Sequence, residues 1–303
     1  MKTRILIFVL MFTGVVSYAQ QDSQFTQYMY NTININPAYA GSRGALSIFG
    51  LHRTQWVGMD GAPTTNSFSV NTPINNSSLG LGVSFINDKI GPTNENNISV
   101  DLSYSIQMNE TYKLAVGLKG SANLFNLDSG DLNPADPGDD HLQSIDNKFD
   151  PNIGAGIYLH SDKFYAGFSV PNFLQTTSYS DNDYSVNKEK INYYFITGYV
   201  FDLNPDVKFK PALLTKMVQG APLQVDVSGN FMLYDKFVVG VAYRWSAAIS
   251  GMVGFQVTDG LYIGYAYDHE TTNLSHYNSG SHEIFLRYEL FNNYDRITTP
   301  RFF

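Results

Sequence analysis

Apolar residues alternate with small or polar residues along much of the chain between Tyr112 and Leu290. In residues 237–245, Phe, Val, Val, Tyr and Trp alternate with Val, Gly, Ala and Arg. Side chains of a β-strand point to opposite faces in turn, so a period of two predicts strands that each have one apolar face. Residues 261–268 and 283–290 repeat the pattern. The chain is therefore predicted to be an all-β protein.

Strands of this kind can be placed from residue 44 to residue 291, with boundaries good to about two to four residues. The predicted strands are residues 44–57, 64–73, 78–88, 96–108, 111–126, 150–161, 163–171, 190–203, 206–216, 222–234, 236–246, 248–258, 260–269 and 280–291. Their number is about 14, and bacterial single-chain outer-membrane barrels have an even number of strands.

The connections between these strands differ in length according to their position. Those after strands four, six, ten and twelve are short, whereas those after strands five, seven and thirteen are long and cover residues 126–149, 171–190 and 268–279. Short turns on one rim and long loops on the other are typical of a barrel whose termini are both periplasmic. This sorting favours a transmembrane up-and-down antiparallel β-barrel over a soluble β-sandwich.

The amino terminus predicts export. Lys2 and Arg4 precede an apolar run at residues 5–16, and Ser17 and Ala19 are small residues where a signal peptidase would cleave, after Ala19 or Gln20. The apolar run is too short for a transmembrane helix, which needs about 20 residues. The chain has no cysteine, which excludes disulfide bonds. An exported, cysteine-free chain suits a large barrel in a Gram-negative envelope.

Composition agrees with a barrel in outer-membrane lipid. The chain has 21 Tyr and 21 Phe, and aromatic girdles at both membrane interfaces require such residues. Its net charge of -8 gives no basic surface for nucleic acid. The predicted organisation is a signal peptide (1–19), an N-terminal periplasmic or plug segment (20–43), a barrel (44–291) and a C-terminal tail (292–303).

No residue pattern predicts catalysis, a metal site or a cofactor. The six histidines lack metal-ligand spacing. Residues 126–149 are rich in aspartate and could hold calcium, but their spacing does not match an EF-hand, and an acidic surface loop is favoured. Phosphate-binding loops and nucleophile elbows are missing from the sequence.

Two stretches fit the strand pattern less well. The first predicted strand has apolar residues on both faces, and its His52 and Arg53 are expected near a rim or facing a plugged lumen. Pro211 cannot donate a hydrogen bond to a neighbouring strand, which indicates a bulge or an irregular seam there.

Residues 24–44 lie between the signal peptide and the first strand. Phe25, Tyr28 and Met29 would share one face of a short helix, and Pro37 would end it. Two interpretations remain open: a plug or rim-packing element that covers apolar surface at the barrel mouth, or a docking site for a periplasmic partner. On the second interpretation Tyr39 would join the other four as a candidate partner-binding residue.

The chain also resembles a known family. The stretches that carry the resemblance are QFTQYM at 24–29, INPAYAGSRG at 35–44, HRTQW at 52–56, GAPTTNSFSV at 61–70, PNIGAGIYLHSDKFYAGFSVPNF at 151–173 and SHEIFLRYELF at 281–291. They are similar to the PorP/SprF family of outer-membrane proteins, which belongs to the type IX secretion and gliding-motility apparatus of Bacteroidetes.

The resemblance implies a barrel that is not an enzyme. It implies type IX translocon components as partners, together with a secreted client protein that carries a C-terminal sorting domain and is exported or attached to the surface, such as a gliding adhesin. Tyr179, Tyr184 and Tyr277 in the long loops would then belong to the outer docking surface. The alternative is a general diffusion channel, which would need a wide, charged lumen, whereas many predicted inward residues are Gly, Ala, Ser or Tyr.

Overall fold

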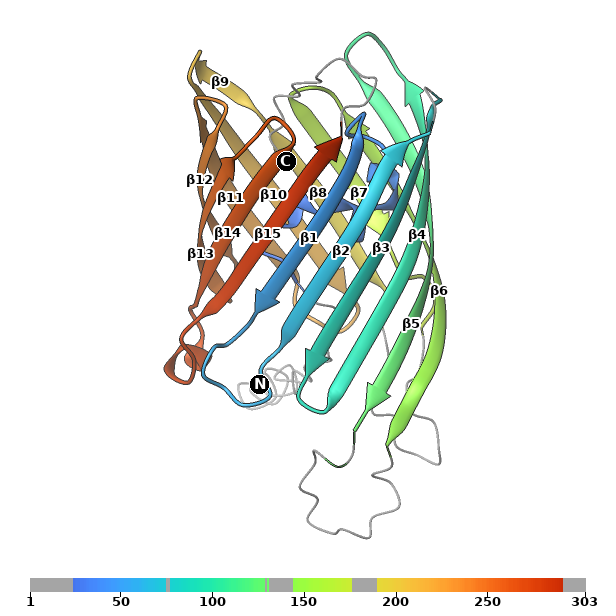
Figure 1. The fold of residues 1–303 in the computed structure, drawn as a ribbon, viewed down its shortest axis with the longest axis vertical. Helices are drawn as coiled ribbons and strands as arrows, with labels where there is room; N and C mark the ends of the chain where they lie inside the picture. The colour runs from blue at the N-terminus through green and yellow to red at the C-terminus, as the bar shows by residue number, and fades with distance from the viewer. Residues whose placement is uncertain (1–23, 75–76, 129, 131–143, 176–189, 291–303) are drawn as a thin grey trace, which may run out of the picture.

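The computed structural model describes residues 24–74, 77–128, 130, 144–175 and 190–290. Its strands form a single antiparallel sheet whose edges meet, because β15 pairs with β1 and β10 pairs with β11 (Figure 1). Of the fifteen strands, β9 pairs only with β10 and lies outside the ring, which leaves fourteen in the closed barrel. The predicted fold class and strand number are confirmed.

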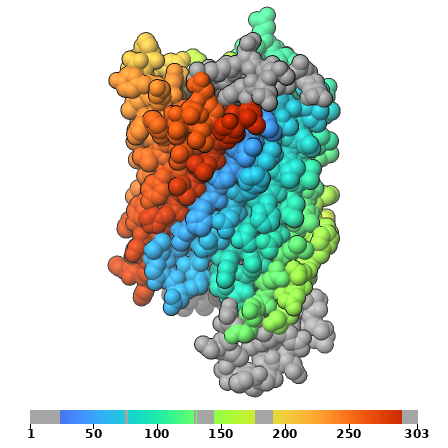
Figure 2. Space-filling model, viewed as in Figure 1, coloured from blue at the N-terminus to red at the C-terminus, as the bar shows by residue number. Residues whose placement is uncertain are grey.

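The strands follow one another around the barrel in chain order, and Figure 2 shows β15, β1 and β2 as adjacent slanted bands of one continuous wall. Their bounds are β1 Leu46–Thr54, β2 Thr64–Pro73, β3 Leu79–Ile90, β4 Thr93–Gln107, β5 Lys113–Leu127, β6 Ile145–His160, β7 Phe164–Val170, β8 Asn192–Tyr199, β9 Phe201–Asn204, β10 Val207–Val218, β11 Gln224–Leu233, β12 Phe237–Arg244, β13 Ala248–Gln256, β14 Leu261–Glu270 and β15 Ser281–Leu290. No helix among the described residues is long and apolar enough to cross a membrane.

The two faces of the wall differ in chemistry, and β4 shows the difference most clearly. Ser99, Asp101 and Ser103 point inward and are buried, whereas Val100 and Leu102 point outward and are about half exposed. A soluble protein places its apolar face inside, whereas a lipid-embedded barrel places it outside. The same facing holds at β12, where Val241 is exposed and the neighbouring Ala242 packs against the interior.

We call the rim where β1 begins and β15 ends the terminal rim, since Leu46 pairs there with Leu290. The connections after β2, β4, β6, β11 and β13 lie at this rim, and each is short. The opposite rim, called the loop rim, carries the longer connections 128–144, 171–191 and 271–280, the last with the 3₁₀ turn η5 (Asn273–His276). It also carries the tight turn at residues 91–92. The predicted sorting of long and short connections holds at the positions named, although the loop rim mixes both kinds.

The predicted strand 190–203 is wrong as a single element, because it divides into β8 and β9. The ladder between β8 and β10 ends at Ala212, and the ladder between β9 and β10 begins at Phe209, so it is interrupted at Lys210 and Pro211. Proline has no N–H to donate across a ladder. The irregular seam predicted at Pro211 is confirmed, and it is the place where β9 departs from the ring.

Candidate functional site: the barrel lumen and the segment inside it

Residues 24–43, which we call the lumen segment, lie inside the barrel rather than in its wall (Figure 1). The segment forms three 3₁₀ turns, η1 (Tyr28–Tyr30), η2 (Thr32–Asn34) and η3 (Pro37–Tyr39), and every residue of η1 and η3 is buried. So short a helix leaves much of its backbone without internal partners, and those groups need partners elsewhere. The barrel wall supplies many of them.

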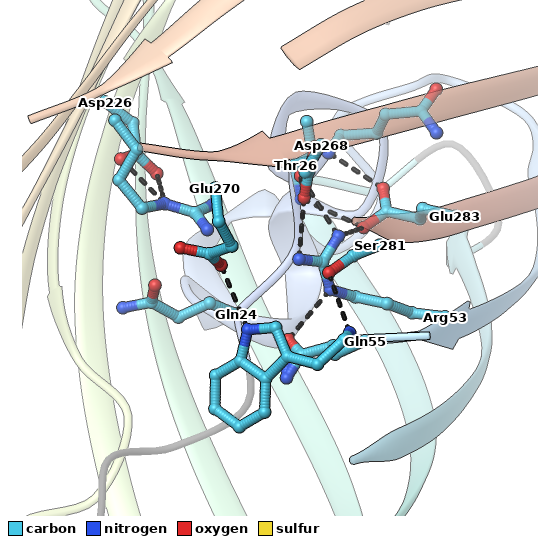
Figure 3. Close-up of polar contacts among 12 residues, drawn as sticks. Gln24, Thr26, Arg53, Gln55, Asp226, Asp268, Glu270, Ser281 and Glu283 are labelled. Atoms are coloured by element: carbon cyan, nitrogen blue, oxygen red, sulfur yellow. Dashed lines mark hydrogen bonds and ion pairs between the residues drawn. The ribbon is translucent and has the colours of Figure 1, made fainter. Parts of the chain in front are cut away.

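A single carboxylate of the wall receives the first part of the lumen segment. Thr26 N and Gln27 N donate to the two oxygens of Glu283, each at 2.9 Å. The Thr26 hydroxyl donates to Asp268 Oδ2 at 2.6 Å (Figure 3). Hydrogen bonds to an ionised acceptor are roughly twice as strong as neutral ones. The segment is therefore held by two backbone N–H groups on Glu283 of β15 and by the Thr26 side chain on Asp268 of β14.

Arg53 of β1 balances this pair of acids. Its guanidinium lies 2.7 Å from Asp268 and 3.1 Å from Glu283, and it also donates to the Thr26 hydroxyl at 3.1 Å. The Arg53 side chain is 3% exposed. Buried charges are tolerated when paired and hydrogen-bonded, and removing one partner of such a pair costs about 3–5 kcal/mol. Arg53, Asp268 and Glu283 therefore act as one unit, which we call the Arg53 cluster.

Further polar contacts lie between this cluster and the loop rim. Gln24 and Gln224 exchange hydrogen bonds through their side-chain amides, and Gln224 is the first residue of β11. Near the same rim, Trp56 Nε1 in the connection after β1 donates to Glu270 Oε1 at the end of β14 at 3.0 Å (Figure 3). The lumen segment thus makes side-chain contact with the wall at the level of the rim itself.

Aromatic rings fill the middle of the lumen. The Tyr30 ring packs on Phe285 with ring centroids 4.7 Å apart and on Tyr262 at 5.4 Å, and its hydroxyl lies 3.1 Å from the Tyr262 hydroxyl. Lys210 Nζ lies 5.3 Å from the centre of the Tyr30 ring. Cation–π contact and ring packing therefore stabilise this part of the segment.

Polar side chains continue along the inner wall beside η2. Asn31 Nδ2 donates to Ser67 Oγ at 3.0 Å, and Asn34 Nδ2 donates to the same oxygen at 2.8 Å. Asp101, which is fully buried, lies 3.2 Å from Lys119 Nζ. An unpaired buried carboxylate would be costly, and the lysine offsets that cost. The inner polar residues of β2, β4 and β5 thus serve the lumen rather than a dry core.

The last part of the segment is capped from within. Asn36 Oδ1 accepts from Ala38 N at 3.0 Å, and Pro37 occupies the first position of η3. Asn36 Nδ2 also donates to the Ile157 carbonyl of β6 at 3.0 Å. Ser103 Oγ donates to the Ala40 carbonyl at 2.7 Å. One asparagine therefore both begins the turn and fixes it to the wall.

Glycines of the inner wall allow this close approach. An added Cβ would lie 2.2 Å from Ala40 O at Gly80, 2.2 Å from Ala38 N at Gly117 and 2.2 Å from Asn36 Oδ1 at Gly156. No real Cβ contact is so short, so only glycine fits. By contrast, nothing lies within 4 Å of a Cβ added at Gly120, which faces outward on the same strand as Gly117. We call Gly80, Gly117 and Gly156 the glycine seat.

A cavity of about 440 Å³ opens where the segment reaches the terminal rim. It is lined by residues 40–44 and by the short connections after β2, β4 and β6, with Lys113 and His160 among its side chains. Arg43 at its edge forms an ion pair of 2.5 Å with Glu289. The lumen segment is thus tied to β15 immediately before the chain turns back into β1.

The structure places the predicted partner-binding residues in two different settings. Phe25, Tyr28, Met29, Pro37 and Tyr39 come together inside the barrel, and all five are buried, so they form no exposed surface in this conformation. Tyr277 lies in the connection 271–280 at the loop rim and is 73% exposed. Tyr179 and Tyr184 lie outside the described residues. A role in partner binding stays a prediction for all eight.

Sequence reasoning missed the Arg53 cluster. His52 and Arg53 were expected together near a rim or the lumen, but His52 is exposed on the outer face, where it bonds Asn66, and only Arg53 faces inward. The cluster could have been found by looking for charged residues at the inward positions of the alternating strands. Asp268 in β14 and Glu283 in β15 both occupy such positions.

Among the residues that the structure describes, no group of three or more His, Asp or Glu side chains could hold a metal ion. Most of the aspartate-rich stretch 126–149 and the whole of the predicted signal peptide 1–19 lie outside the described residues.

Comparison with known proteins gives both a family and a fold. The family described as type IX secretion system membrane protein PorP/SprF matches residues 17–288. No curated protein sequence is significantly similar to the chain.

Among solved structures, the CymD monoaromatic hydrocarbon channel is similar with a TM-score of 0.51 and 12% identity, covering 88% of this chain and 93% of that one. The Acinetobacter baumannii outer membrane protein Omp33 is similar with a TM-score of 0.47 and 9% identity, covering 81% of this chain and 98% of that one. At such identities the likeness concerns the fold alone. A closed barrel with an apolar outer face, matched by the family over most of its length, leads to one conclusion: the chain belongs to the PorP/SprF family of type IX secretion system membrane proteins and is an outer-membrane β-barrel.

Proposed function

We propose that this barrel serves in the outer membrane as a partner or anchor for a secreted protein that carries a C-terminal sorting domain. In this role it supports export or surface attachment of that client, of which a gliding adhesin is one kind, and it works with components of the type IX translocon. Membership of the secretion family supports the proposal.

One observation carries the choice between an anchor and a diffusion channel: the lumen is occupied by the chain's own residues 24–43. A general porin keeps a water-filled channel, whereas plugged barrels serve other tasks. The Arg53 cluster and the glycine seat hold the segment at both ends through buried contacts. A barrel filled in this way is suited to binding at its rims rather than to passive flow.

The proposal assigns the two rims to different partners. In this arrangement the start of β1 and the end of β15 face the periplasm. The loop rim then faces outward and meets the client, and the terminal rim meets periplasmic components. Tyr277 at the loop rim is 73% exposed, and Tyr234 at the terminal rim is 71% exposed. Exposed tyrosines are frequent among residues that dominate protein interfaces.

These two tyrosines allow a matched test. Tagged protein is purified from native outer membranes, and the amount of co-purified client with a C-terminal sorting domain is measured by mass spectrometry. We expect Tyr277→Ala to lower that amount about tenfold, as the loss of about 1.4 kcal/mol at a central contact would. Tyr234→Ala should leave it unchanged. Equal client recovery from both variants would contradict the assignment of the loop rim.

The diffusion-channel alternative is tested by conductance in planar bilayers. The anchor proposal predicts that the intact barrel shows no steady open-pore current. A stable conductance, together with purification free of any client or translocon component, would favour the channel instead.

A further inference from the structure

The direction of the lumen segment is set by its contacts at the loop rim. Gln24, the first described residue, exchanges hydrogen bonds with Gln224, where β11 begins. Gln224 pairs with Lys216, close to the end of β10 at Val218, so this position lies at the loop rim. Thr26 and Gln27 contact Glu283, only two residues after β15 begins at the same rim. The segment therefore begins at the loop rim.

The other end of the segment lies at the opposite rim. Ala40 accepts a hydrogen bond from Ser103, which pairs with Gly80 next to the start of β3. Arg43 pairs with Glu289, one residue before β15 ends. Leu46 then begins β1 opposite Leu290. Residue 43 is thus at the terminal rim.

The contacts between these ends follow one another in order along the barrel axis. Asn31 bonds Ser67 in the half of β2 nearer the loop rim. Ile33 packs against Gly82, and Asn36 then bonds the Ile157 carbonyl near the terminal end of β6. The segment crosses the lumen once, without turning back.

From this path we infer that the lumen segment is reached at Gln24 from the loop rim, on the face of the membrane opposite to the start of β1 and the end of β15. With these two strand ends in the periplasm, Gln24 is accessible from the cell surface, where a partner can reach the plug without entering the periplasm.

Physical reasons oppose the reverse path. If residues 24–43 ran in the opposite direction, Thr26 and Gln27 would lie near the terminal rim and could not contact Glu283, which lies two residues after the start of β15 at the loop rim. At Gly80 and Gly117 an added Cβ would lie 2.2 Å from the backbone of Ala40 and Ala38, so the segment's own backbone already fills the space beside the wall there.

A cysteine-free chain makes the inference simple to test, because each introduced cysteine is the only thiol. We would prepare Gln24→Cys, Tyr277→Cys as the loop-rim reference and Tyr234→Cys as the terminal-rim reference. Intact cells and opened cells are treated with a thiol reagent that cannot cross the outer membrane, and labelling is divided by that of the denatured protein.

The expected result is that Gln24→Cys and Tyr277→Cys react from the same side and Tyr234→Cys only from the other, whichever side is outward. Labelling of Gln24→Cys together with Tyr234→Cys would overturn the inference. If Gln24→Cys is shielded from both sides, an epitope tag placed directly before Gln24 and read by antibody gives the answer by the same comparison with tags at Tyr277 and Tyr234.

Discussion

The inner and outer faces of the same strand place very different demands on neighbouring residues. In β15, Glu283 is 1% exposed and binds two backbone N–H groups of the lumen segment and Arg53, whereas the next residue, Ile284, is 48% exposed on the outside. In β5, Gly117 meets the backbone of Ala38, and Gly120 meets nothing. The outer face needs only to be apolar, because lipid does not distinguish one apolar side chain from another. The inner face must match one particular segment.

Removing a charged side chain from the inner face should give the largest difference in stability between inner-face and outer-face variants. Glu283→Ala leaves Arg53 with one acid fewer and leaves Thr26 N and Gln27 N without their acceptor. We expect the free energy of unfolding in detergent to fall by about 3–5 kcal/mol. The matched outer variant, Ile284→Ala, should cost much less because lipid or detergent refills the space. Similar losses at both positions would break the comparison.

When a polar group is added instead, we expect the substitution on the outer face to lower stability more than the one on the inner face. Val241→Arg puts a guanidinium on the outer face of β12 near mid-strand, where a barrel residue of this kind costs about 2–4 kcal/mol. Ala242→Ser, one residue on, places a hydroxyl opposite Ser228 and Ser250 on the inner face and should change stability by less than about 0.5 kcal/mol. Refolding into lipid vesicles under urea measures both. A tolerated Val241→Arg would mean that this face does not contact lipid.

Adding a single methyl group to each face of β5 should give a smaller difference in stability between the two faces. Gly117→Ala would place Cβ 2.2 Å from Ala38 N and 2.5 Å from the Pro37 carbonyl carbon, so the lumen segment must shift. Overpacking of this kind costs about 1–3 kcal/mol. Gly120→Ala on the same strand has open space around it and should be neutral. Thermal unfolding of the two variants is the measurement, and a neutral Gly117→Ala would show that the segment is not seated on β5.

The smallest expected effect is the loss of one cap. Asn36→Ala removes the acceptor for Ala38 N and the donor to Ile157 O, for an expected loss of about 0.5–2 kcal/mol. Asn36→Ser keeps an uncharged side-chain oxygen that can accept from Ala38 N and loses the donor to Ile157 O, so it should fall between Asn36→Ala and the native chain. If the two variants are equally stable, the cap on η3 contributes nothing.

The contrast between faces also explains what sequence analysis could predict. Alternation with a period of two depends on local geometry, and it correctly predicted an all-β chain with about 14 strands, although it did not separate β8 from β9. It was ambiguous at β1 because Phe49 and Leu51 point inward and are buried, where Phe49 packs against Phe285 in the core around the lumen segment. A plugged lumen therefore obscures the pattern where the plug is apolar.

The interior arrangement depends on contacts between residues far apart in the chain, which no local pattern reveals. Arg53 meets Asp268 and Glu283 only because β1 closes the barrel against β15. Gly80, Gly117 and Gly156 appear in the sequence as ordinary small inward residues, and only the position of residues 36–40 shows why each lacks a side chain. The plug interpretation of residues 24–44 was one of two possibilities that the sequence left open.

The central claim is that residues 24–43 occupy the lumen, and cross-linking tests it most directly. Asn31 Nδ2 lies 3.0 Å from Ser67 Oγ on the inner face of β2, while the next residue, Phe68, is 50% exposed on the outer face. In native membranes, a short bifunctional thiol reagent should link Asn31→Cys to Ser67→Cys and should not link Asn31→Cys to Phe68→Cys. Equal yields for the two pairs, or a link to Phe68→Cys alone, would place the segment outside the barrel and contradict the account.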